Sequence, residues 1–211
     1  MRSASLDAVA GVVLAAGRSV RMGRPKAFLP LGVGETFLSR VLFTLDAAGA
    51  APLIVVGTAE WPADPAGVSP HRARLVFNPA PDRGQVSSLQ CGLAAVPPAI
   101  TAVLFTLVDV PLVTVDTVRT LIDVMRGTDA DVVRPERSGR HGHPVLVART
   151  VVEDLLAANV SETARAVLGR YAASTVDVPV QDEGAFLDID TPEEYERLAR
   201  TLREARGVEP G

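Results

Sequence analysis

The sequence predicts an α/β domain in which helices cover both faces of an open, mostly parallel sheet. Two features of the chain lead to this prediction. Short apolar runs rich in β-branched residues alternate with segments whose apolar residues recur at helical spacing, and the short runs are almost continuously apolar. Such runs are typical of parallel strands buried on both faces, and their alternation with helices predicts right-handed βαβ crossovers. A chain of 211 residues fits one three-layer, Rossmann-like domain.

Seven runs are expected to form the strands of this sheet. Those in the first part of the chain are Val9–Ala15, Leu53–Val56, Leu75–Asn78 and Val103–Val108. Those in the second part are Val132–Arg134, Val145–Val147 and Thr175–Val180. Because no linker separates two cores, residues 1–211 are expected to form a single domain, with 207–211 as a frayed tail.

Helices are expected between these runs. Leu38–Leu45 and Val115–Met125 carry apolar residues at helical spacing, after the possible caps Thr36 or Ser39 and Thr114. Further helices are expected at Val151–Ala158, Thr163–Tyr171 and Pro192–Arg206. Two turn-rich segments are expected on the surface: Thr58–Arg74, as a loop or a poorly formed helix, and Ser138–His143, as an insert between two strands.

Composition excludes several classes of protein. The formal net charge is −4, whereas a nucleic-acid binder needs a basic face. Cys91 is the single cysteine, so an intrachain disulfide is impossible and a reducing compartment is expected. Val9–Ala16 is expected to be a core strand, not part of a signal peptide, and no apolar stretch reaches the ~18 residues of a membrane helix. We therefore expect a soluble, cytoplasmic protein that binds neither nucleic acid nor membranes.

A glycine-rich and basic loop follows the first strand. It has the sequence LAAGRSVRMGRPK and runs from Leu14 to Lys26. Ligands of α/β sheets bind at the carboxyl ends of the strands, where Gly17 and Gly23 would let backbone N–H groups approach a phosphate. Four cations lie within nine residues, and Lys26 would act as a point charge on a phosphate. The spacing matches neither a Walker A loop nor a dinucleotide fingerprint, so an ordinary loop with solvated arginines is the alternative.

Acidic residues lie at two positions suited to a metal ion. Asp109 ends the fourth predicted strand and precedes Pro111, which places a carboxylate where Mg²⁺ could be held beside a nucleotide. A turn aspartate that caps the next segment is the alternative. Near the end of the chain, an extended Asp188-Ile189-Asp190 would turn both carboxylates to one face and Ile189 into the core.

The residues after Asp190 form a capping box. Thr191, Pro192 and Glu194 are suited to the N-cap, N1 and N3 positions of the last helix. The N-terminal hydrogen bonds of the helix therefore require neither Asp188 nor Asp190. Both carboxylates are therefore candidates for a metal site, and solvated surface carboxylates are the alternative.

Polar residues in two further segments are less decisive. Asn78 ends a strand, and Ser87 and Ser88 lie near a helix start, where the local pattern alone favours a turn asparagine and a helix cap. His143 lies in a Gly-flanked insert, and loops often carry function. A zinc site is not expected, because none of the three histidines lies at zinc-like spacing from the cysteine.

The basic loop resembles the signature of the molybdenum cofactor nucleotidyltransferases, L-A-A-G-x-S-x-R-M-G-x-P-K, and most closely that of their cytidylyltransferase branch. The resemblance extends through the N-P, G-x-x-S-S-L, D-x-P, G-H-P and D-I-D-T-P-E blocks, with Val108 in place of a commonly small residue. It implies catalytic roles for Arg18, Lys26 and Asp109, and a metal site of Asp109 with Asp188 or Asp190 for Mg²⁺. It also implies an acceptor contact at His143 and a nucleotide site of Leu14, Ala15, Ala16, Gly17, Arg18, Lys26, Asn78, Ser87 and Ser88.

The resemblance implies transfer of a nucleoside monophosphate, with CTP favoured as donor, onto the phosphate of molybdenum-loaded molybdopterin. A recipient molybdoenzyme would be a further partner. In the family, Ala-Ala-Gly accompanies the cytidylyl branch, and glycine replaces the second alanine, Ala16 here, in many guanylyl enzymes. The alternatives are a guanylyltransferase, a cytidylyltransferase for a sugar or polyol phosphate, and a non-catalytic cofactor chaperone. Retention of both acidic blocks argues against the chaperone, because binding alone does not need a two-sided metal site.

Overall fold

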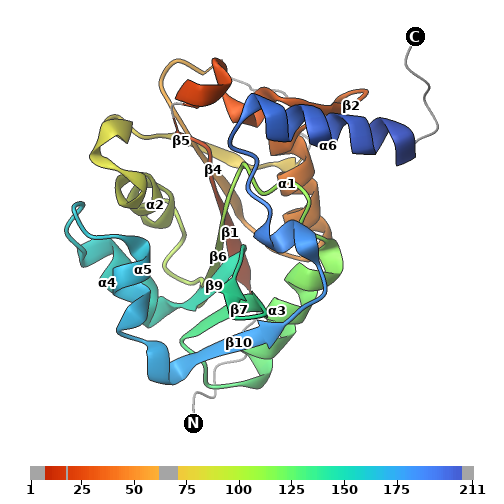
Figure 1. Cartoon of the computed structure of the whole chain (residues 1–211). Coiled ribbons are helices and arrows are strands. Elements are labelled where there is room, and N and C mark those ends of the chain that lie inside the picture. The colour runs from red at the N-terminus through yellow and green to blue at the C-terminus, as the bar shows by residue number, and fades with distance from the viewer. Residues whose placement is uncertain (1–7, 18, 62–70, 206–211) are drawn as a thin grey trace.

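The computed structural model describes residues 8–17, 19–61 and 71–205, and its centre is a mostly parallel sheet (Figure 1). The strand order is β10-β7-β9-β6-β1-β4-β5, and β8 pairs with β7. Neighbours are parallel except around β9, which lies antiparallel between β6 and β7, and at β8. The bounds are β1 Val9–Leu14, β4 Leu53–Gly57, β5 Arg74–Phe77, β6 Ala102–Leu107, β7 Val132–Arg137, β8 Arg140–His141, β9 Val145–Ala148 and β10 Thr175–Pro179.

Helices cover both faces of the sheet, so the predicted three-layer α/β architecture is confirmed (Figure 1). One core cluster lies under α1 (Phe37–Ala47), α3 (Val115–Gly127) and α6 (Pro192–Ala205). The other lies under α2 (Gln85–Ala94), α4 (Arg149–Ala157) and α5 (Ala164–Gly169). Side chains of β1 alternate between the two clusters, as the two-residue period of a strand requires. No helix of the described residues is long and apolar enough to cross a membrane.

Most predicted elements are present with small shifts at their ends. Thr36 caps α1, and Ser39 is its partner in a capping box three residues later, so Ser39 is not the cap itself. The hairpin of β2 (Pro30–Gly32) and β3 (Glu35–Thr36) was not predicted, because strands this short show no period. Most of the predicted loop Thr58–Arg74 lies outside the described residues, and Arg74 itself begins β5. The predicted tail 207–211 also lies outside them.

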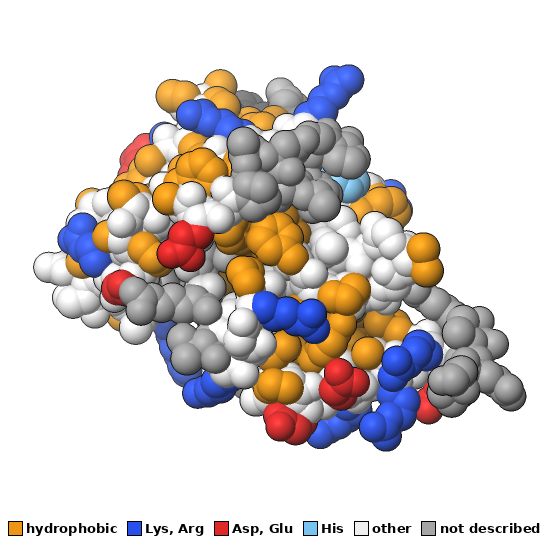
Figure 2. All heavy atoms as spheres, turned by 90° about the horizontal axis from the view of Figure 1, so that it is seen from above, with side chains coloured by type: hydrophobic (Ala, Val, Ile, Leu, Met, Phe, Trp, Pro, Cys, Tyr) orange, Lys and Arg blue, Asp and Glu red, His pale blue; other side chains and the backbone are white. Residues whose placement is uncertain are grey.

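Charged side chains are dispersed over the face of the molecule seen from above. Figure 2 shows blue Lys and Arg side chains scattered among orange hydrophobic and red acidic ones on the described part of this face. The described part of this face therefore carries charges of both signs interspersed with apolar side chains.

Gly92 lets α2 lie close to the sheet. A Cβ atom added there would lie 2.5 Å from Val12 Cγ1 of β1 and 2.9 Å from Val56 Cγ2 of β4. We expect Gly92→Ala to lower the free energy of unfolding by about 1–3 kcal/mol from overpacking, offset in part by the ~1 kcal/mol helix preference of alanine. Urea denaturation measures the change. Gly127→Ala in α3 is the control, because no atom lies within 4 Å of its added Cβ; an equal loss in both variants would contradict this packing account.

Candidate active site

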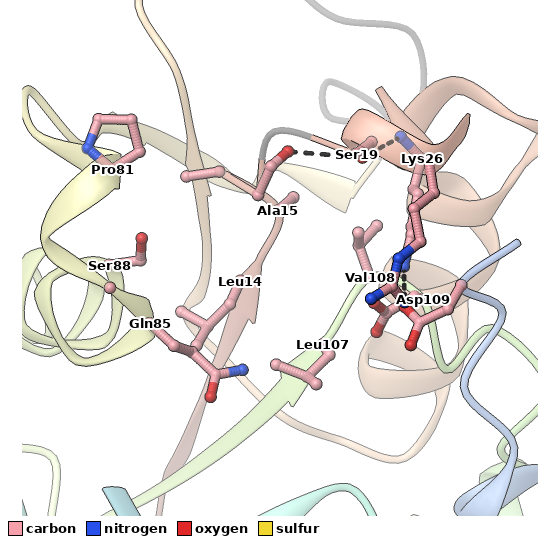
Figure 3. Close-up of a pocket in the computed structure, with 15 residues that line it drawn as sticks. Leu14, Ala15, Ser19, Lys26, Pro81, Gln85, Ser88, Leu107, Val108 and Asp109 are labelled. Atoms are coloured by element: carbon pink, nitrogen blue, oxygen red, sulfur yellow. Dashed lines mark hydrogen bonds and ion pairs between the residues drawn. The ribbon is translucent and has the colours of Figure 1, made fainter. Parts of the chain in front are cut away.

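A cavity of about 390 Å³ lies beyond the carboxyl ends of β1 and β6. In Figure 3, Lys26 and Asp109 face each other on one side, Pro81, Gln85 and Ser88 come from the opposite side, and β1 ends between them. Eight of the residues predicted for the nucleotide or metal site line the cavity, namely Leu14, Ala15, Ala16, Gly17, Lys26, Ser88, Asp109 and Asp190. Arg18, predicted to bind the nucleotide and act in catalysis, lies outside the described residues.

The basic loop is held in shape by Ser19. The Ser19 hydroxyl accepts the N–H of Lys26 at 3.2 Å and donates to the Gly17 carbonyl at 3.4 Å (Figure 3). The Ser19 carbonyl accepts the N–H groups of Met22 and Gly23. Gly23 has a φ of +64°, so its requirement for glycine is conformational. The sequence-based prediction that its N–H faces a phosphate is wrong, because that N–H is bonded within the loop.

Lys26 joins two acidic residues that lie far apart in the sequence. Its Nζ lies 2.8 Å from Asp109 Oδ2 and also donates to Asp190 Oδ1. The Lys26 side chain is 11% exposed and that of Asp109 19%, so this contact is shielded from water. Burial disfavours the charged amine, but hydrogen bonds and charges from Asp109 and Asp190 outweigh it and raise the pKa of Lys26. Lys26 is also the only lysine in the chain.

The C-terminal acidic segment is fastened to the end of β6. Ile189 is 1% exposed, and its N–H donates to the Asp109 carbonyl at 2.9 Å. Asp188 and Asp190 are both exposed on either side of it, as the extended pattern predicted. Desolvation, reinforced by the charges of Asp109 and Asp190, raises the pKa of Asp188. Three carboxylates therefore repel one another at the end of one strand, with one ammonium group between two of them.

The predicted capping box of α6 is present. The Glu194 N–H donates to the Thr191 hydroxyl at 3.2 Å. The Glu194 carboxylate in turn accepts the N–H groups of Thr191 and Asp190. These bonds fix the backbone of Asp190 and leave its carboxylate directed at Lys26. The helix cap and the acidic site thus use different residues of the same block.

The residues present fit a divalent cation at Asp109 and Asp190. Asp109 Oδ1 is buried and has no hydrogen-bond partner among the described residues. A buried carboxylate oxygen without a partner is costly, and a cation supplies the missing interaction. The described residues hold no ready-made group of three or more metal-binding side chains, so phosphate oxygens or water would have to complete the coordination.

Asn78 and Ser87 are placed differently from the other predicted nucleotide contacts. Asn78 is 3% exposed, and its amide donates to Ser87 Oγ at 3.0 Å and to Ser88 Oγ at 2.9 Å. Ser87 also donates to the Gly84 carbonyl at 2.7 Å. Neither Asn78 nor Ser87 lines the cavity, whereas Ser88 does. Asn78 and Ser87 therefore hold the turn before α2 in place, and Ser88 is the member that faces a ligand.

A second cavity of about 440 Å³ adjoins the first and contains His143 in its wall. Leu14, Gln85 and Leu107 line both cavities. The His143 N–H donates to the Ala185 carbonyl at 2.8 Å, and its buried Nδ1 has no partner among the described residues. Burial lowers the pKa of His143 against the opposing charge of Asp109, so the ring is neutral at neutral pH.

Gln85 is among the cavity-lining residues that the sequence motifs did not predict. It is the first residue of α2, and the described structure gives its amide no hydrogen bond. It lies in the shared wall of the two cavities and extends toward Leu14 in Figure 3. The sequence signal for Gln85 is its position inside the G-x-x-S-S-L block, beside the two predicted serines.

The chain matches the model of a family described as the MobA-like NTP transferase domain over residues 11–176. The chain belongs to this family. The predicted family and the predicted nucleotidyltransferase class are therefore confirmed. Among its relatives, the molybdenum cofactor guanylyltransferase of Bradyrhizobium sp. (strain ORS 278) is 32% identical over 94% of this chain and 97% of that protein.

Solved structures of other proteins have the same fold. The crystal structure of Rv0371c from Mycobacterium tuberculosis H37Rv aligns with a TM-score of 0.72 and 28% identity, covering 92% of this chain and 99% of that one. A complex of the same protein with manganese aligns with a TM-score of 0.69 and 27% identity, covering 92% and 98%. The shared fold thus extends over nearly the full length of both chains.

Proposed function

We propose that this MobA-like protein transfers a nucleoside monophosphate from a nucleoside triphosphate to the phosphate of a molybdopterin-type acceptor and releases pyrophosphate. The observation that carries the proposal is the pair of adjoining cavities, one bordered by the basic loop and the Lys26–Asp109 pair and the other by His143. Such a pair can hold a donor and an acceptor with their reacting groups side by side. The guanylyltransferase relative, named for the molybdenum cofactor, supports the choice of acceptor.

The chemistry needs no protein base. An acceptor phosphate monoester is mostly dianionic at neutral pH, because its second pKa is about 6. Its oxygen attacks the α-phosphorus of the triphosphate, a new P–O bond forms, and the bond to the β-phosphate oxygen breaks. Catalysis then consists of positioning and charge neutralisation. Lys26 would neutralise phosphate charge, and Gly17 leaves open space beside the loop for the phosphate chain.

The proposed metal ion is Mg²⁺, held by Asp109 and Asp190, with Asp188 as the alternative to Asp190. Two features support the preference for Asp190 over Asp188: Asp190 lines the cavity together with Asp109, and the carboxylates of Asp109 and Asp190 both contact Lys26. A divalent ion bound there would offset the negative charge of the phosphate oxygens. The manganese complex of the mycobacterial relative also favours a divalent ion in this fold.

The proposed donor is CTP, and GTP is the second candidate because the Bradyrhizobium relative is named a guanylyltransferase. The proposal of CTP rests on Ala16, which is 2% exposed and lines the nucleotide cavity. Its methyl group takes space that a larger purine would use. Pyrophosphate release with CTP, GTP, ATP or UTP, Mg²⁺ and molybdenum-loaded molybdopterin tests the function. No release with any nucleotide, while the acceptor still binds, would favour a cofactor chaperone instead.

We expect Ala16→Gly to narrow the CTP:GTP ratio of kcat/KM. The change removes the methyl group but adds no hydrogen bond to guanine, so we do not expect full reversal. One misfitting methyl group corresponds to roughly 1–3 kcal/mol, or about 10–200-fold in specificity. Steady-state kinetics with both nucleotides give the ratio. Preference of the wild-type protein for GTP would refute CTP as the proposed donor. An unchanged CTP:GTP ratio in the variant would show that Ala16 does not discriminate between the bases, and Ser88 and Gln85 would be the next candidates.

We expect His143→Ala to raise the KM for the acceptor several-fold and to leave the KM for the nucleotide unchanged. The neutral ring presents a buried nitrogen without a protein partner, which suits a hydrogen bond to a bound molecule. Titration of each substrate at saturating levels of the other measures both constants. His71→Ala is the control, because His71 pairs with Asp46 and lines neither cavity. A rise in nucleotide KM alone would contradict this placement of His143.

A further inference from the structure

The second cavity is lined by basic side chains. Its described lining residues include three arginines but no aspartate or glutamate, namely Arg134, Arg140 and Arg165. His141 and His143 also line it, and the His143 ring is neutral. The chain as a whole carries a net charge of −4, so this concentration of positive charge is local. Of the basic loop, Leu14 lines this cavity, whereas the loop's charged residues Arg21 and Lys26 line the first cavity.

Part of this positive charge is already balanced. Arg134 Nε lies 2.6 Å from Asp177 Oδ1, and His141 Nε2 lies 3.4 Å from Asp177 Oδ2. The charges of Arg134 and His141 hold the pKa of Asp177 below its usual value, with the Arg134 hydrogen bond as the main cause. These two residues therefore contribute little net charge to a ligand.

Arg140 and Arg165 remain to act on a ligand. Arg140 donates to the Phe186 carbonyl at 3.0 Å and lies over the Phe186 ring, so its guanidinium is positioned without being paired by a carboxylate at contact distance. Its charge does reach Asp188, whose raised pKa it partly opposes. Arg165, in the first turn of α5, forms no hydrogen bond or ion pair with any described residue. Both side chains are exposed.

We propose that the acceptor carries a second anionic group besides the phosphate that reacts, and that Arg140 and Arg165 bind it in the second cavity. This inference rests on the proposed function for its placement of donor and acceptor. The reacting phosphate belongs at the end of the cavity toward Asp109, where Gln85 and Leu107 join the two cavities. The second anionic group then lies toward α5 and β8. In a molybdenum-loaded acceptor, the metal-bearing end is such a group.

The test compares a compound that has two anionic ends with a matched compound that has one. Fructose 1,6-bisphosphate and fructose 6-phosphate serve as probes, titrated calorimetrically into protein whose nucleotide site is filled with α,β-methylene-CTP and Mg²⁺. Filling that site prevents the probes from binding at the basic loop. We expect wild type to bind the bisphosphate about tenfold more tightly, a difference of about 1.4 kcal/mol, because only the bisphosphate has a second anionic end for the two arginines to bind.

Arg140→Ala and Arg165→Ala should each reduce this ratio toward one and leave binding of the monophosphate unchanged. Arg170→Ala is the matched control, because Arg170 caps α5, pairs with Glu162 and does not line the cavity. An equal affinity of wild type for both probes, or a ratio unchanged in both variants, would overturn the inference. Failure of α,β-methylene-CTP and of CTP and GTP themselves to bind would contradict the proposed function instead. The loss of bisphosphate affinity in Arg140→Ala and Arg165→Ala, measured in a Lys26→Ala background that weakens the basic loop, would then decide the role of the second cavity.

Discussion

Asp109→Asn is expected to lower the rate of nucleotidyl transfer by roughly 10²-fold or more at saturating Mg²⁺, because a charged group at the reacting centre is lost. Asparagine keeps the shape of the side chain but not the charge that faces Lys26 and the proposed metal ion. The fold should be retained, because the backbone carbonyl of Asp109, not its side chain, holds Ile189. Pyrophosphate release gives the rate, and thermal unfolding checks the fold.

Asp123→Asn is the matched control for this variant, because Asp123 lies exposed on α3 and forms its ion pair, at 3.7 Å, with Arg126 of the same helix. Asp190→Asn should raise the Mg²⁺ concentration needed for half-maximal rate more than Asp188→Asn does. A larger increase in the Mg²⁺ requirement of Asp188→Asn would make Asp188, in place of Asp190, the metal ligand. Near-wild-type turnover in Asp109→Asn would remove Asp109 from the metal site altogether.

Lys26→Ala is expected to raise the KM for the triphosphate and to lower kcat, together by roughly 10²-fold in kcat/KM, as for loss of one charged group that stabilises the transition state. The same substitution should strengthen, not weaken, the binding of a divalent metal ion. Without the ammonium group, Asp109 and Asp190 face each other unneutralised, so Mn²⁺ should bind more tightly in the absence of nucleotide. Electron paramagnetic resonance of Mn²⁺ measures this affinity.

Lys26→Arg separates charge from geometry, since it keeps the charge but not the compact ammonium group between the two carboxylates. Because Lys26 is the only lysine in the chain, an amine-specific reagent provides an independent check. Bound triphosphate should protect this single ε-amine from acylation. Equal nucleotide affinity in wild type and Lys26→Ala, together with unprotected acylation, would contradict the role of Lys26 at the phosphates.

The strands were predictable because a strand that is buried on both faces has apolar residues at nearly every position, and such a run is visible in the local sequence. Val9–Leu14 and Ala102–Leu107 are apolar at nearly every position, and both were expected within a residue at each end. The antiparallel direction of β9 could not be predicted, because a short apolar run pairs equally well in either direction. Its neighbours β6 and β7 fix the direction through contacts distant in sequence.

The site was predictable as a set of motifs but not as a set of contacts. The sequence motifs assign Lys26 to a phosphate and Asp109 to a metal ion, and the structure pairs the two side chains across 83 positions of the chain. Asn78 and Ser87 carry polar groups that suit a nucleotide equally well, and only the fold shows that they bond to each other. In each case the role of the side chain depends on a contact with a residue that is distant in the sequence, and such contacts cannot be predicted from a local motif.

The most direct test of nucleotidyl transfer follows isotopic label from the triphosphate. CTP labelled with ³²P at the α position, or in a parallel reaction at the γ position, is incubated with the protein, Mg²⁺ and molybdenum-loaded molybdopterin, and the products are separated. The α label should appear in the acceptor product and the γ label in pyrophosphate, in equal amounts. Transfer of the γ label to the acceptor, or release of pyrophosphate without α label in the acceptor product, would contradict the account.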